Sequence, residues 1–119
     1  MFNHVHLRVS DLAASAAFYA TVLRPLGLEA TFDDGALVEF GPLALSSDGP
    51  GSTNVHLAFD AADHEAVDAF HRVGLEAGHR DHGAPGLREY ADDYYAAFLL
   101  DPDGNNVEAV HRAGLGGPA

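Results

Sequence analysis

The sequence predicts an α+β protein built from two tandem β-α-β-β-β modules, whose strands pair into a cup-shaped, half-barrel sheet. An alternating strand pattern followed by a helical pattern occurs at the N-terminus and again near the middle of the chain. The two copies can be aligned: His4 precedes Phe18 by fourteen positions, and His56 precedes Phe70 by fourteen. Because one such unit cannot bury the face of its own sheet, pairing of the two units would make one core. We therefore expect a single domain over residues 1–119.

The first module covers about residues 1–48. Its opening strand, 4–9, alternates apolar and polar side chains, so that one face is apolar and the other polar. Ser10 or Asp11 can cap the helix that is predicted over residues 12–23. Three short strands follow, separated by Asp-Asp-Gly and Gly-Pro turns, at 31–32, 36–40 and 43–45.

The second module covers about residues 53–112 and follows a linker rich in serine and glycine. Its opening strand is predicted at 55–59, and Asp63, which aligns with Asp11, can cap a helix over residues 66–77. A long loop with one short strand should follow, then a hairpin closed by an Asp-Pro-Asp-Gly turn; these segments are 79–93, 95–100 and 106–110. The tail, 113–119, is rich in glycine and is expected to fray.

Each helix is expected to face the core with one apolar stripe. The stripes are Leu12, Ala16, Tyr19 and Leu23 in the first helix, and Ala66, Phe70, Val73 and Ala77 in the second. Gly74 lies inside the second helix, where glycine is less favourable than alanine by about 1 kcal/mol. Gly74 therefore disfavours the last turn of the predicted helix.

Composition narrows the classes of function. The chain has no cysteine, which excludes a disulfide framework, a thiolate ligand and a thiol nucleophile. Its net charge is −12 and all six basic residues are arginine, which argues against nucleic acid and anionic membrane surfaces as partners. No apolar run has the length of a membrane span, and no signal peptide pattern is present, so a cytoplasmic protein is expected.

Glu108 stands out because it is a carboxylate inside a short strand pattern, on the face opposite Val107 and Ala109. Helices that cover the apolar faces would leave the polar faces of the opening strands and of the last hairpin around one concavity. This concavity would contain His4, His6, His56 and Glu108. Two imidazoles and a carboxylate suit a divalent ion such as Fe²⁺, Mn²⁺, Zn²⁺, Ni²⁺ or Co²⁺, with positions left open for water and substrate.

Four segments carry a resemblance to a known family: Asn3 to Leu12, Phe18-Tyr19, Val55 to Phe59, and Asp101 to Ala109. Over nearly its full length the chain resembles the vicinal oxygen chelate superfamily, which includes glyoxalase I, extradiol dioxygenases and bleomycin-binding proteins. The resemblance implies that one divalent metal ion is bound by His4, His56 and Glu108. It also implies a homodimer and a small substrate with vicinal oxygens, in a lyase, isomerase or dioxygenase reaction. The two modules of one cup would come from one chain or from two.

Departures from individual subfamilies leave the reaction open. Glyoxalase I has a fourth ligand, a glutamate, on the last strand of its first module, and this chain has Leu43-Ala44-Leu45 there. Extradiol dioxygenases have a catalytic tyrosine three residues before the Asp-Pro turn, where this chain has Phe98. Bleomycin-binding proteins are acidic, as this chain is, and lack the metal ligands. A metal-free protein that sequesters a drug or metabolite is therefore the alternative function.

Five residues receive expected roles in the concavity. His6 and Glu108 are the expected catalytic residues, with His6 as a base near the metal. Arg88 belongs to a loop that could cover the cup and would bind an anionic group of the substrate. Tyr94 and Phe98 are expected to contact substrate, although the alternation of the strand leaves open which side each of them lines.

The remaining histidines are expected to be structural or solvated. His64, His71 and His111 are predicted on the surface of the protein. His79 and His82 flank Asp81 on the long loop and could form a second metal site.

Overall fold

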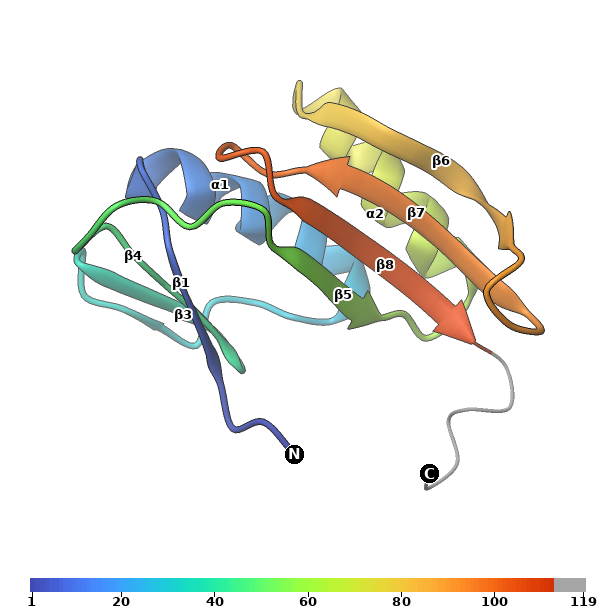
Figure 1. The fold of residues 1–119 in the computed structure, drawn as a ribbon, viewed down its shortest axis with the longest axis horizontal. Coiled ribbons are helices and arrows are strands. Elements are labelled where there is room, and N and C mark those ends of the chain that lie inside the picture. Colours follow the sequence, from blue (N-terminus) through green and yellow to red (C-terminus); the bar gives the residue numbers. More distant parts are fainter. Residues whose placement is uncertain (113–119) are drawn as a thin grey trace.

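A computed structural model describes residues 1–112 of the chain (Figure 1). The elements in order are β1 (Val5–Arg8), α1 (Leu12–Leu23), η1 (Arg24–Leu26), β2 (Phe32–Asp33), β3 (Leu37–Phe40), β4 (Leu43–Ser46), β5 (His56–Asp60), α2 (His64–Glu76), β6 (Arg80–Arg88), β7 (Tyr94–Leu100) and β8 (Asn106–Arg112). The tail that was expected to fray, 113–119, lies outside the described residues. No helix in the described part of the chain is long and apolar enough to cross a membrane.

The predicted fold class is confirmed. One four-stranded sheet has the order β1-β4-β3-β2 and the other has the order β5-β8-β7-β6. In each sheet the first strand of the module is parallel to the last strand, and the two remaining pairings are antiparallel. The two modules therefore repeat one topology. Their sheets lie side by side and do not close into a barrel (Figure 1).

The N-caps of the helices confirm the alignment of the two modules. The carboxylate of Asp11 accepts a hydrogen bond from the backbone N–H of Ala14, and the carboxylate of Asp63 accepts one from Ala66. Each aspartate thus satisfies one of the free N–H groups in the first helical turn. The two helices therefore begin at equivalent positions of the repeat.

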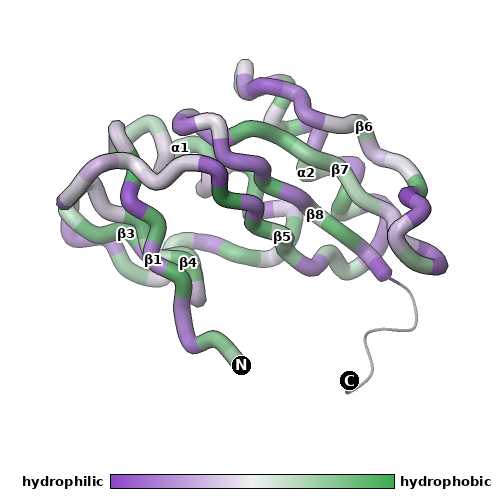
Figure 2. The backbone as a smooth tube through the Cα atoms, in the orientation of Figure 1, coloured by the Kyte–Doolittle hydropathy of each residue, from purple (hydrophilic) through white to green (hydrophobic). Residues whose placement is uncertain are grey.

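One main hydrophobic core is shared by the two modules. It contains Leu7 and Phe18 from the first module together with Phe70 and Leu99 from the second, all buried. The two helices contact each other, and α2 lies behind β6, β7 and β8 (Figure 1). The opposite face of the second sheet carries a separate, smaller apolar cluster on β7 and β8. The strand β7 is apolar along most of its length (Figure 2), since it packs against both clusters.

Tyr19, Leu23 and Phe70 of the expected stripes are buried, whereas the other buried residues of the helices lie outside the stripes. Leu12, Ala16 and Ala66 are partly buried and pack against the core. In α1 the buried residues are Ser15, Phe18, Tyr19, Val22 and Leu23, and in α2 they are Val67, Phe70, His71 and Gly74. Gly74 explains why the buried face of α2 is rotated away from the expected stripe. A Cβ atom at this position would lie 2.5 Å from Leu99 Cδ1 and 3.4 Å from Val22 Cγ1. The helix therefore approaches the sheet and α1 through its glycine, which is a packing role that propensity alone does not indicate.

The long loop of the second module is mostly strand. Residues Arg80–Arg88 form β6, nine residues long, where only a short strand was expected. Two shifts of register interrupt its pairing with β7, between Asp81 and Gly83 and between Gly83 and Gly86. Such bulges accommodate glycine and proline within a strand, so residues that usually signal a loop are part of an edge strand here.

The Asp-Pro-Asp-Gly turn anchors β8 to the rest of the molecule. The buried carboxylate of Asp101 accepts hydrogen bonds from the Tyr19 hydroxyl (2.7 Å) and from the backbone N–H groups of Asp103 and Asn105 (2.9 Å each). Asp103 in turn accepts a hydrogen bond from the backbone N–H of Ser10 in the first module (3.1 Å). The turn therefore joins the two modules and sets the start of the strand that carries Glu108.

Candidate functional site

Glu108 lies at the centre of the open face of the second sheet. Its cross-strand neighbours are Ala58 on β5 and Phe98 on β7, and directly opposite residues share one face of a sheet. The side chain is only 1% exposed. As the sequence indicates, Val107 and Ala109 point to the opposite face and belong to the main core.

Both oxygens of the Glu108 carboxylate accept hydrogen bonds. Oε1 accepts one from His56 Nε2 at 2.7 Å, and Oε2 accepts one from the Tyr94 hydroxyl. A buried carboxylate is costly without such partners, so the pair of donors accounts for a charge at this depth. Burial and the hydrogen bond to Glu108 raise the pKa of Tyr94 to about 12. Tyr94 is therefore protonated at neutral pH and continues to donate to Glu108.

Tyr94 and Phe98 both lie on the Glu108 face, which settles the question that the alternation of β7 left open. The neighbouring Tyr95 points the other way, and its hydroxyl donates to Asp68 of α2 at 2.6 Å. The phenol of Tyr94 holds the carboxylate of Glu108. Sequence patterns missed this contact, because the register Tyr94–Arg112 places Tyr94 four residues along β8 from Glu108, within the reach of a long side chain only.

Arg88 and Phe98 line a shallow pocket beside Glu108. Its volume is about 230 Å³, and its lining residues are His82, Gly83, Arg88, Tyr90, Phe98 and Asn106. The Phe98 ring lies between two polar groups: its centroid is 6.2 Å from that of His56 and 5.3 Å from Arg88 Cζ. His56, Glu108 and Arg88 therefore surround one aromatic floor.

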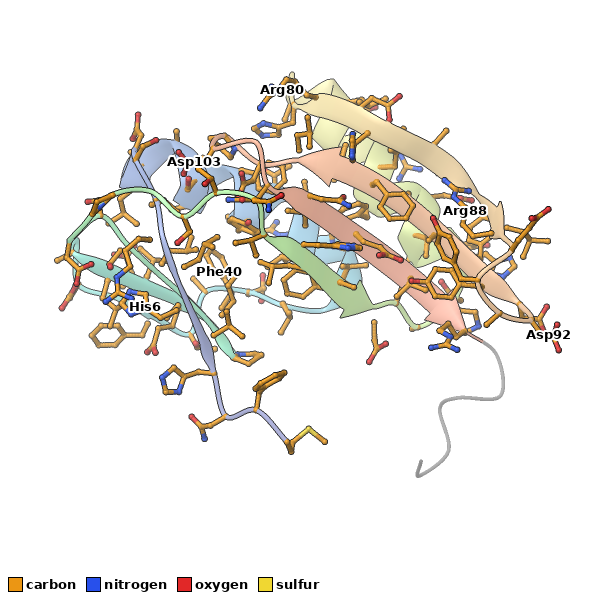
Figure 3. All side chains as sticks on the ribbon, viewed as in Figure 1. His6, Phe40, Arg80, Arg88, Asp92 and Asp103 are labelled. Atoms are coloured by element: carbon orange, nitrogen blue, oxygen red, sulfur yellow. The ribbon has the colours of Figure 1, made fainter. Side chains whose placement is uncertain are left out.

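His4 and His6 lie on the first sheet, and the structure does not bring them to Glu108. His4 is exposed, and its Nδ1 is 2.8 Å from the side-chain oxygen of Asn3. His6 Nε2 is 2.7 Å from the Ser46 hydroxyl, which donates to Asp48 at 3.0 Å. Figure 3 shows His6 and Arg88 toward opposite ends of the long axis of the molecule. Because the two sheets of one chain do not close into a barrel, His4 and His6 stay away from Glu108 in the second module.

Two of the three expected metal ligands come together. His56 Nε2 and Glu108 Oε1 are 2.7 Å apart, close to the separation of about 3 Å expected for neighbouring nitrogen and oxygen ligands of a divalent ion. Among residues 1–112, however, no group of three or more His, Cys, Asp or Glu side chains could hold an ion. An imidazole nitrogen and a carboxylate oxygen suit a divalent metal ion. The described part of one chain brings together only these two donors, from His56 and Glu108.

The histidines expected on the surface differ in their contacts. His71 is buried, and its Nε2 is 2.9 Å from Asp81 Oδ1. The pKa of Asp81 is lowered, mainly by this hydrogen bond. Asp81 is thereby engaged by α2, and His79 packs edge-on against Phe18 with ring centroids 4.8 Å apart. These contacts give Asp81 and His79 structural partners in place of the second metal site that was considered.

Comparison with known proteins gives one family match. A family model described as the Glyoxalase/Bleomycin resistance protein/Dioxygenase superfamily matches residues 1–109. Among curated proteins no significant match was found.

Solved structures resemble the whole of the described fold. A glyoxalase/bleomycin resistance protein from Albidiferax ferrireducens T118 is 32% identical, with a TM-score of 0.82 and 94% of this chain and 99% of that chain covered. A putative glyoxalase from Bacillus halodurans is 25% identical, with a TM-score of 0.69 and coverage of 94% and 96%. Lactoylglutathione lyase from Agrobacterium tumefaciens is 24% identical, with a TM-score of 0.68 and coverage of 99% and 97%, and it shares the fold.

Proposed function

Because this chain belongs to the Glyoxalase/Bleomycin resistance protein/Dioxygenase superfamily, we propose that it is a glyoxalase-like enzyme that depends on a divalent metal ion. Its substrate would be a small molecule with vicinal oxygens, and its reaction would be of the lyase, isomerase or dioxygenase type. The observation that carries the proposal is the buried Glu108 carboxylate, which lies 2.7 Å from His56 Nε2 on an open sheet face.

A second copy of the chain would supply the third ligand, His4. His4 and His56 occupy equivalent places in the two modules: His4 directly precedes the edge strand β1, and His56 begins the edge strand β5. An apolar groove of about 190 Å³ lies between these edges, and its lining includes Phe2, Val5, Leu57 and Phe59. Phe2 is 86% exposed in one chain. This apolar groove and the two open edges would be covered in a homodimer whose cups combine the first module of one chain with the second module of the other.

The residues of the cup would have different roles in the reaction. A bound divalent ion would act as a Lewis acid toward the vicinal oxygens of the substrate. Tyr94 donates to Glu108 Oε2 and would hold the carboxylate in place as a ligand, as outer partners of ligands do. His6 would act as the base, because it shares the open face of β1 with His4 and its ring is oriented by Ser46. Phe98 forms an apolar floor that excludes water from one side of the substrate.

Metal content of the purified protein tests the proposal. Elemental analysis should find about one equivalent of a transition metal per chain in the wild type, and a large loss after His56→Ala. His64→Ala is the matched control, because His64 stacks on Tyr95 at 3.9 Å between ring centroids and lies outside the cup. Wild-type protein that remains empty after reconstitution with Fe²⁺, Mn²⁺, Zn²⁺, Ni²⁺ and Co²⁺ would refute metal dependence.

One observation favours a second function, a metal-free protein that sequesters a drug or metabolite. In the described part of a single chain Glu108 is already paired with His56 and Tyr94, and the third donor is absent from their neighbourhood. The net charge of −12 suits a cationic ligand. Tight binding of a cationic ligand by metal-free protein, unchanged by His56→Ala, would favour this function over the enzyme.

A further inference from the structure

We propose that the substrate of this site carries a carboxylate at the end remote from its vicinal oxygens, and that Arg88 binds this carboxylate. The inference rests on the proposed function for the position of the vicinal oxygens, at His56 and Glu108. The anion-binding subsite itself rests on the surroundings of Arg88 in the pocket beside Phe98. It names the class of substrate that the proposed enzyme would accept, a small organic acid.

The guanidinium group of Arg88 is held in a defined place by its own strand. Its Nη2 donates to the backbone oxygen of Ala84 at 2.7 Å, and Cζ lies 5.3 Å from the centroid of the Phe98 ring. Two glycines make room for it: a Cβ atom on Gly86 would lie 3.1 Å from Nη1, and one on Gly83 would lie 3.4 Å from Nη2. A guanidinium fixed in this way loses less conformational freedom when it binds a ligand.

The charge around Arg88 favours an anion although the protein is strongly acidic. In residues 1–112 Arg88 forms no ion pair with an acidic side chain, whereas Arg8 pairs with Asp48 at 3.0 Å. A second arginine, Arg112, lies on the same face, since both arginines are cross-strand neighbours of Tyr94. The one buried carboxylate nearby, Glu108, already accepts two hydrogen bonds. Arg88 and Arg112 thus place two guanidinium groups on the open face, and neither is in an ion pair within residues 1–112.

The spacing of the site fits one small molecule. Phe98 is directly opposite Glu108 on the adjacent strand, and adjacent strands are about 5 Å apart. Arg88 lies over the same ring and comes from β6, the strand next to β7 on the side away from β8. A substrate whose vicinal oxygens reach His56 and Glu108 would therefore cross Phe98 and present its other end to Arg88. The pocket of about 230 Å³, lined by Arg88 and Phe98, would hold the carboxylate end of such a molecule.

A carboxylate matches the donors better than a larger, more highly charged anion. Guanidinium and carboxylate are both planar and can form two parallel hydrogen bonds. A dianionic phosphoryl group would carry more charge toward Glu108, Glu89 and the other acids of a chain with net charge −12. Inorganic phosphate is therefore included below as a competitor, and we expect it to compete weakly.

Two catechol probes that differ in one substituent separate the contributions of the metal site and of Arg88. Binding of 3,4-dihydroxybenzoate and of 4-methylcatechol is measured by calorimetry, without oxygen, in the presence and absence of Zn²⁺. Both probes offer vicinal oxygens, and only the first has a carboxylate at the opposite end. We expect the wild type to bind the carboxylate probe about ten- to hundredfold more tightly, as a charge-assisted hydrogen bond predicts. Addition of inorganic phosphate should reduce this preference only at high concentration.

Three variants test whether Arg88 is responsible. Arg88→Gln should abolish the preference, and Gly86→Ala should reduce it while the charge is kept, because the added Cβ displaces the guanidinium. Arg72→Gln removes an equal charge from the exposed side of α2 and should leave the preference intact. Circular dichroism confirms that each variant is folded.

The outcomes distinguish the subsite from the proposed function. Equal affinity of the two probes for the wild type, an undiminished preference in Arg88→Gln, preferential binding of phosphate, or no binding of either probe at millimolar concentration would each overturn the inference. If Zn²⁺ tightens binding of 4-methylcatechol while the carboxylate adds nothing, the metal site stands and the subsite fails. If the carboxylate preference persists and Zn²⁺ has no effect on either probe, the subsite stands and metal dependence fails.

Discussion

Replacement of Asp101 by alanine is expected to lower the free energy of unfolding by about 3–5 kcal/mol. The carboxylate is fully buried and receives hydrogen bonds from the Tyr19 hydroxyl and from the backbone N–H groups of Asp103 and Asn105. Alanine would leave these buried donors without a partner. Since a domain of this size is stable by only about 5–15 kcal/mol, the midpoint of denaturation in urea should fall markedly.

Tyr19→Phe is the matched control, because it removes one donor and keeps the carboxylate. Its expected cost is about 1 kcal/mol. Burial, followed by the nearby charge of Asp101, raises the pKa of Tyr19 far above its usual range, so its hydroxyl stays protonated and donates at neutral and moderately alkaline pH. A loss below 1 kcal/mol in Asp101→Ala would contradict the role assigned to the turn.

If Glu108 is a ligand of the proposed metal ion, Glu108→Gln is expected to weaken metal binding by more than about a hundredfold while the fold is retained. Loss of an outer partner of a ligand already weakens metal binding by about 10- to 100-fold, and glutamine removes the anionic ligand itself. Tyr94→Phe, which removes only the hydrogen bond to Oε2, should cause the smaller loss, about 10- to 100-fold. Competition with a chromophoric chelator measures both affinities.

The order of the two effects is the informative result. If Tyr94 only packs against Glu108, Tyr94→Phe will leave the affinity unchanged, because the ring is retained. If Glu108→Gln binds metal as tightly as the wild type, then Glu108 is not a ligand. Tyr95→Phe is a suitable control, since Tyr95 donates to Asp68 on the other side of the same strand.

The sequence was sufficient for those parts of the fold that local chemistry determines. Alternation of side chains predicted which face of β8 carries Glu108, and the spacing of Asp11 and Asp63 predicted two equivalent helix caps. The repeat predicted that both modules have one topology. These features depend on residues that are neighbours along the chain or on equivalent places in the two copies.

Features that depend on contacts between distant segments could not be predicted in this way. Gly74 looked unfavourable in a helix, and its value is visible only when Leu99 and Val22 are seen against it. Glycine and proline in β6 resembled a loop, because the bulges that accommodate them depend on pairing with β7. The buried pair of His71 and Asp81 likewise joins a helix to a strand ten residues later.

The candidate site was likewise predicted only in part. Strand alternation and the repeat brought His56 and Glu108 together correctly as neighbours, and they are 2.7 Å apart. The position of His4 and His6 depends on how the first module is placed against the second, which alternation does not specify. The sheets of one chain stay open, so whether His4 meets Glu108 becomes a question about two copies of the chain.

The metal content of a mixed dimer tests this central claim most directly. A His4→Ala chain and a Glu108→Gln chain, carrying different tags, are refolded together and the heterodimer is isolated. If each cup combines two chains, one of the two sites contains wild-type His4 and Glu108, and the heterodimer should hold about half of the wild-type metal while each parent holds little. A heterodimer as empty as its parents, or a protein that remains monomeric, would contradict the shared site.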